Sequence, residues 1–205
     1  EDEYGGFRIN VKGTFDKIRT NFFIEITAGD IITPREIKYR YHSIFEDKYI
    51  NIMAYNIETI ISEKFESIIS KNISTTRAKD FYDLYMLINK NINDINTKNL
   101  VKAIENTFNK RNTDFDIDNF REIVELLKES NTLQRVFTDY QEKLEYTKQV
   151  KYDDTINSIT KIIDILESEH PLYNLLILIE KGTVSELKEI KAIQEITYYL
   201  NWKND

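Results

Sequence analysis

Hydrophobic and polar residues alternate in the first part of this chain, and beyond residue 55 hydrophobic residues recur at helical spacing instead. The clearest alternation is Phe22–Thr27 (FFIEIT), which predicts a strand with apolar side chains on one face. Shorter strands are predicted at Arg8–Val11, which Gly13 should end, and at Tyr49–Ala54.

The later part of the sequence favours helices, because residues 35–170 contain neither glycine nor proline. Apolar stripes predict successive helices that start at or contain Asn56, Arg77, Thr97, Phe120, Asn131, Ile156, Pro171 and Thr183. Asn56 and Thr97 are predicted as helix caps, and Asn131 with Gln134 as a capping box. The patterns together predict an α+β fold, with a sheet domain in residues 1–54 and a mostly helical domain in residues 55–205.

The composition of the chain excludes several kinds of function. The chain has 205 residues, no cysteine, a net charge of −7 and a sequence pI near 5.1. Disulfides and thiolate metal sites are therefore excluded, and any contact with RNA must come from a local basic patch. No apolar run approaches the roughly 20 residues that span a bilayer, so no membrane role is expected. A cytoplasmic location fits the absence of cysteine.

Lys64 is the first candidate for chemistry. It lies three residues after Ile61 and therefore falls on the apolar stripe of its own predicted helix. Such a lysine either extends to water at the edge of the core or reaches a buried anion. If it has no anion, its desolvation is costly, so Lys64→Ala is expected to leave the melting temperature unchanged or raised.

The next predicted helix opens with Arg77, Lys79, Asp80 and Asp83 in the pattern Arg-x-Lys-Asp-x-x-Asp. One interpretation is local ion pairing, of Arg77 with Asp80 and of Lys79 with Asp83, which contributes under about 1 kcal/mol per exposed pair. The other is a site, because Lys64 and Asp80 are expected to approach each other across a pocket between the two helices, with Glu25 on its wall. That arrangement is typical of phosphate or metal binding.

Glu25 is a further candidate, as a carboxylate in the middle of the clearest strand. With other carboxylates around it, Glu25 could bind a divalent cation; alternatively, its face of the strand is simply exposed to solvent.

Five segments of this chain resemble the AbiEii/AbiGii nucleotidyltransferase toxins of type IV toxin–antitoxin and phage abortive-infection systems in bacteria. The segments are EYGGFRI from Glu3, FIEITAGDIITP from Phe23, YNIETIISEKFESIISK from Tyr55, TRAKDFYDLYML from Thr76 and AIENTFNKR from Ala103. Their order and spacing agree over residues 3–111, which is about half the chain. The resemblance implies a nucleotidyltransferase-type sheet, of which this chain carries a small remnant, followed by the helical bundle.

The same resemblance implies roles for individual residues. Lys64 and Asp80 are expected to be catalytic, and Lys64, Arg77, Lys79 and Asp83 to bind the nucleotide. Glu25 matches the family's third metal-binding carboxylate. The implied reaction uses an NTP and Mg²⁺, transfers a nucleotide to an acceptor such as tRNA, and is controlled by an antitoxin.

The chain departs from the family pattern at its start. It lacks the family's Gly-Gly-Thr motif and its Asp-x-Asp pair before residue 22. It is therefore expected to be an N-terminally truncated form that is inactive by itself. The alternative function is a non-catalytic helical module that binds an antitoxin or another protein.

Overall fold

The first compact unit is an antiparallel hairpin of two ten-residue strands. The computed structural model describes residues 6–91 and 93–169, and the chain divides into two compact units between Ile31 and Ile32. The hairpin pairs β1 (Gly6–Phe15) with β2 (Ile18–Thr27), so the strand predicted at Phe22–Thr27 is confirmed as the second half of β2.

Gly13 does not end the first strand, contrary to the sequence prediction. It stays in the β-ladder opposite Thr20, and β1 continues to Phe15. A Cβ atom at Gly13 would lie 3.3 Å from the ring of Phe22, so the glycine leaves room for this aromatic side chain. The turn comes three residues later, where Asp16 has a positive φ of 51°.

The second unit begins with another antiparallel hairpin, of β3 (Ile37–His42) with β4 (Tyr49–Ala54). The bounds predicted for β4 are confirmed, whereas β3 was not predicted. The α+β class is confirmed, with the strands forming two separate two-stranded sheets. Strands give way to helices after Ala54, as the pattern indicates; the division into domains at residues 54 and 55 stays a prediction.

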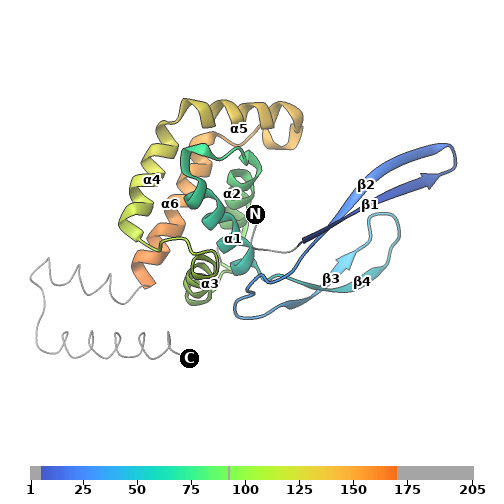
Figure 1. Cartoon of the computed structure of the whole chain (residues 1–205), viewed down its shortest axis with the longest axis horizontal. Helices are drawn as coiled ribbons and strands as arrows, with labels where there is room; N and C mark the ends of the chain where they lie inside the picture. The colour runs from blue at the N-terminus through green and yellow to red at the C-terminus, as the bar shows by residue number, and fades with distance from the viewer. Residues whose placement is uncertain (1–5, 92, 170–205) are drawn as a thin grey trace, which may run out of the picture. The chain divides into compact units, whose positions relative to one another are not determined.

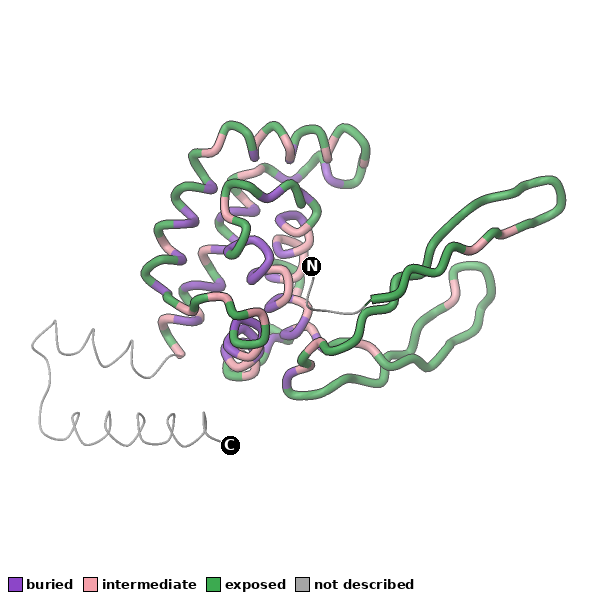
Figure 2. The backbone as a smooth tube through the Cα atoms, viewed as in Figure 1, coloured by how far each residue is buried: buried purple, intermediate pink, exposed green. Residues whose placement is uncertain are grey.

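Each hairpin has one apolar and one polar face, because residues paired across a ladder share a face and alternate along each strand. In β1–β2 the apolar face includes Phe7, Ile9, Phe15, Ile18, Phe22, Ile24 and Ile26. In β3–β4 it includes Ile37, Tyr39, Tyr41, Ile50 and Ile52. Figure 2 shows both hairpins as almost wholly exposed, in contrast to the helices.

Six α-helices follow the strands in the described residues (Figure 1). They are α1 (Ile57–Lys71), α2 (Ala78–Asn91), α3 (Thr97–Lys110), α4 (Ile117–Glu129), α5 (Asn131–Lys143) and α6 (Tyr152–Glu169), with short 3₁₀ turns at Asn72–Ser74 and Glu145–Thr147. The helices predicted from Pro171 and Thr183 lie outside the described residues. None of the described helices combines the length and apolar character needed to cross a membrane.

The predicted cap of α1 is confirmed, and two others are wrong by one residue. The Asn56 side chain accepts a hydrogen bond from the backbone N–H of Thr59. The cap of α3 is Asn96 rather than Thr97. The cap of α5 is Ser130, and Gln134 donates to the Lys128 carbonyl instead of completing a capping box. In both places two adjacent polar residues can cap, and the pattern does not distinguish them.

The core lies among the helices. α1 contacts α2 and α3, and α6 contacts α2, α3 and α4. Phe65 of α1 is fully buried against the rings of Phe108 and Phe120, with centroids 5.9 and 5.6 Å away. The other residues with no exposed surface include Ile61, Ile68, Leu84, Ile88, Leu100, Ile104, Leu127, Ile159, Ile162, Ile163 and Leu166.

The start of α1 is held by the chain segment before β3. The Asn56 amide donates to the backbone carbonyls of Thr33 and Arg35, at 2.7 and 2.9 Å. The Thr59 hydroxyl accepts from the Thr33 backbone N–H at 3.0 Å. Asn56 is therefore both a helix cap and a tertiary link, which positions the helix that carries Lys64.

Candidate active site in the α1–α2 seam

Lys64 of α1 and two aspartates of α2 form one ion-paired cluster. The Lys64 Nζ atom lies 3.0 Å from Asp80 Oδ1 and 2.6 Å from Asp83 Oδ2. The three side chains are 20%, 13% and 22% exposed, so the cluster lies at the edge of the core. The predicted approach of Lys64 to Asp80 is therefore observed, and Asp83 is a second partner that the sequence did not assign to Lys64.

The aspartates change the state expected for Lys64. Burial alone lowers the pKa of its ammonium, but the hydrogen bonds to Asp83 and Asp80 and the two negative charges outweigh burial and raise the pKa above its ordinary value. Lys64 is thus a charged donor held between two carboxylates. Lys64→Ala was expected to be neutral or stabilising because an unpaired lysine loses its hydration at this place. In the structure, the two aspartates compensate this desolvation cost.

Stability is expected to fall as the pH rises above about 10.5, the ordinary lysine pKa. Because the folded-state pKa of Lys64 is raised, its contribution is fully present below the unfolded-state pKa and is lost as the pH rises through the folded value. Burial also raises the pKa values of Tyr82 and Tyr152, which act with the same sign. Above this pH, the melting temperature of Lys64→Met should therefore fall less steeply with rising pH than that of the unmodified chain.

The control for that measurement is Lys128→Met, which removes an α4 lysine whose side chain is 55% exposed. Its melting temperature should fall with rising pH as steeply as that of the unmodified chain. If Lys64→Met also showed this same pH dependence, Lys64 would contribute nothing to the loss of stability at alkaline pH.

The basic residues of the motif lie outside this cluster. Lys79 is exposed and approaches Asp83 at 3.7 Å, which is one of the two local pairs considered from the sequence. The other pair is not formed, because Asp80 binds Lys64 and no carboxylate among the described residues pairs with the Arg77 guanidinium. Arg77 is exposed at the start of α2 and available to a ligand.

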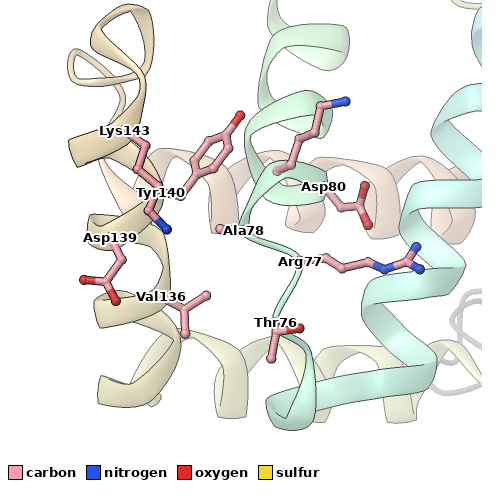
Figure 3. A pocket seen from close by; sticks show the side chains of 9 residues that line it. Thr76, Arg77, Ala78, Asp80, Val136, Asp139, Tyr140 and Lys143 are labelled. Carbon is pink, nitrogen blue, oxygen red and sulfur yellow. The ribbon is translucent and has the colours of Figure 1, made fainter. Parts of the chain in front are cut away.

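A hollow of about 530 Å³ lies between the start of α2 and α5, lined by Arg77, Lys79, Asp80, Tyr140 and Lys143 among others. Figure 3 shows that the charged ends of Arg77 and Asp80 point away from α5. Arg77 and Asp80 therefore border the hollow with their backbone and the first atoms of their side chains. The guanidinium of Arg77 and the carboxylate of Asp80 face the α1 side, where Lys64 lies.

A second charged cluster adjoins the first on α1 and was not found from the sequence. Arg111 pairs with both Glu63 and Glu66, and the Thr113 hydroxyl donates to Glu66 at 2.6 Å. Only 4% of the Glu66 side chain is exposed, so this pairing compensates a nearly buried charge. The signal was present in the motif AIENTFNKR, which ends at Arg111, but its partners lie 45 or more residues away.

Glu25 belongs to the first compact unit, and its place on the wall of the Lys64–Asp80 pocket stays a prediction. Its carboxylate pairs with Arg8 across the β1–β2 ladder, and the Arg8 guanidinium also lies over the Phe23 ring at 4.8 Å. Among the described residues, no three His, Cys, Asp or Glu side chains come together as metal ligands. These residues therefore do not by themselves fit a magnesium centre, and a metal role for Glu25 stays a prediction.

The fold and the α1–α2 cluster define an α+β protein with a lysine and two carboxylates in a seam between helices. A sequence model of the family described as nucleotidyl transferase AbiEii toxin, type IV TA system, matches residues 1–157. Because this match covers most of the chain, the protein belongs to the AbiEii nucleotidyltransferase family of type IV toxin–antitoxin systems. No match was found among curated proteins or solved structures. Membership of this family indicates an antitoxin as partner.

Proposed function

We propose that the protein acts in the bacterial cytoplasm as a phage-defence toxin that transfers a nucleotide from an NTP to an RNA acceptor such as tRNA. Family membership supports the reaction class, and the cluster of Lys64 with Asp80 and Asp83 supports the site. In the proposed reaction an acceptor hydroxyl oxygen bonds to the α-phosphorus of the NTP. The bond to pyrophosphate breaks, and the hydroxyl proton passes to a carboxylate.

The cluster offers groups for two parts of this reaction. A lysine ammonium has three hydrogens, of which Asp80 and Asp83 engage two, so the third can be donated to a phosphate oxygen. Asp80 is the proposed base, because its second carboxylate oxygen remains as an acceptor. Arg77 and Lys79 would add positive charge for the triphosphate, since both are exposed at the start of the same helix.

The proposed cofactor is Mg²⁺, with Glu25 as one ligand. The described residues supply no group of three metal-binding side chains, so the remaining ligands would come from other residues or from another chain. We therefore propose that the present 205 residues transfer little nucleotide by themselves.

A helical interaction module is the second candidate function, and one observation favours it. Lys64 and the two aspartates satisfy one another electrostatically, as a purely structural cluster would. In that case the chain would act by binding its antitoxin or another protein.

A transfer assay tests these candidates. Labelled NTP, Mg²⁺ and total tRNA are incubated with this chain and with a form extended at its N-terminus to supply a Gly-Gly-Thr motif and an Asp-x-Asp pair. Transfer is expected from the extended form only, and Asp80→Asn in that form should abolish it. Strong transfer by the present chain would contradict the proposed need for further carboxylates, and transfer by neither form would favour the interaction module.

A further inference from the structure

The polar face of the β3–β4 hairpin carries two cations, Lys38 and Arg40, and no carboxylate, in a chain of net charge −7. We call it the basic hairpin face; it consists of Lys38, Arg40 and His42 from β3 and Tyr49, Asn51 and Met53 from β4. Lys38, Arg40 and His42 form one row, because they are alternate residues of a single strand. Successive members of such a row are about 7 Å apart.

Tyr49 lies at the loop end of this face, where it pairs with His42 across the ladder. The Arg40 guanidinium lies 3.8 Å from the centroid of the Tyr49 ring, and the His42 ring lies 4.8 Å from it. Tyr49 itself is 52% exposed, so an aromatic surface remains open to solvent beside the planar cationic group. Exposed aromatic rings and arginines are the groups on which unpaired bases stack.

The charges of the basic hairpin face are not neutralised within its ladder. Its six positions contain no carboxylate, and the acidic residues Glu46 and Asp47 lie in the loop beyond the strands. Asp47 pairs with His42, and Glu46 pairs with Lys48. The β1–β2 hairpin differs, because its Arg8 is already paired with Glu25 on the same face.

We propose that the basic hairpin face binds a single-stranded segment of RNA, with Lys38 and Arg40 contacting phosphates and Tyr49 stacking on a base. The cations Lys38 and Arg40 complement a polyanion, and an exposed ring favours unpaired bases over the stacked bases of a duplex. That this RNA is the acceptor of the transferred nucleotide rests on the proposed function; the binding itself does not.

The test measures binding of the full 205-residue chain to a fluorescent single-stranded oligocytidylate of about 12 nucleotides, without NTP or Mg²⁺. Tyr49→Ala is expected to weaken binding by about 5- to 150-fold, the loss typical of one stacked base. Tyr49→Phe keeps the ring and should retain affinity. The matched control is Tyr39→Ala, because Tyr39 is equally exposed, at 50%, on the opposite face of the same hairpin.

Salt dependence tests the phosphate contacts separately. The double variant Lys38→Gln/Arg40→Gln should reduce the slope of log affinity against log salt by about 1.4, or about 0.7 for each lost contact. Lys48→Gln is the control, because Lys48 lies outside the face and is paired with Glu46. A matching duplex RNA should bind more weakly than the single strand. Circular dichroism of each variant checks that the hairpin remains folded.

The proposal is overturned if the unmodified chain does not bind the oligonucleotide, or if Tyr39→Ala weakens binding as much as Tyr49→Ala. It is also overturned if the face variants keep their RNA affinity but lose a protein partner, which would assign the face to a protein interface. Failure of the transfer assay leaves the binding result standing, so the two proposals are distinguished.

Discussion

Lys64→Met is expected to lower nucleotide transfer by about 10²- to 10³-fold in the N-terminally extended form. A loss of this size is typical when one preorganised electrostatic donor is removed from a site that stabilises developing negative charge. The reason here is that the ammonium of Lys64 is held between Asp80 and Asp83 at 3.0 and 2.6 Å, with one hydrogen left for a phosphate. The measurement is the initial rate of label transfer from NTP to total tRNA.

The same substitution is also expected to lower the free energy of unfolding by about 1–3 kcal/mol, because it leaves two like charges one turn apart without their common cation. For Lys64→Ala the sequence alone suggested an unchanged or higher melting temperature, and the observed pairing leads us to expect a loss of stability instead. Stability should be regained in the triple variant Lys64→Met/Asp80→Asn/Asp83→Asn, which removes all three charges together. Urea unfolding measures both values.

Lys128→Met provides the control for activity, since this exposed lysine of α4 is remote in sequence from the cluster and pairs with the neighbouring Glu125. Its transfer rate and stability should stay close to those of the unmodified protein. If transfer by the Lys64 variant fell only in proportion to its folded fraction, Lys64 would be structural, and the interaction module would be the better account.

Helical periodicity was sufficient to place Lys64 and Asp80 in one seam. Lys64 follows Ile61 by three residues, and Asp80 precedes Leu84 by four, so each must face the core side of its helix. Ile61 and Leu84 are both fully buried in the structure. The periodicity did not determine which aspartate Lys64 would meet, because that depends on how α1 and α2 pack.

Long-range partners could not be predicted for the same physical reason. The Glu66 carboxylate is satisfied by Arg111 and Thr113, which approach it only because α3 packs against α1. The β3 strand was not predicted, although Ile37, Tyr39 and Tyr41 alternate with polar residues as in a half-exposed strand. The register with β4 shows that Lys38 and Arg40 share the polar face.

The largest effect on stability is expected at Phe65, which follows Lys64 on α1. Phe65→Ala should lower the free energy of unfolding by about 3–5 kcal/mol, as truncation of a buried phenylalanine typically does. The side chain has no exposed surface, and its ring contacts those of Phe108 on α3 and Phe120 on α4. The truncation would therefore leave a cavity between α1, α3 and α4. Lys64, which is the preceding residue of α1, would then be held less rigidly relative to α2.

Urea unfolding followed by circular dichroism measures the loss at Phe65, and Leu126→Ala is the control. Leu126 lies on α4 but is 50% exposed, so its truncation should change the free energy of unfolding by about 0.5 kcal/mol or less. A loss below about 1 kcal/mol for Phe65→Ala would contradict the packing described for α1, α3 and α4. The position of Lys64 would then depend mainly on polar links of α1, such as the Asn56 and Arg111 contacts and the ion pairs of Lys64 itself.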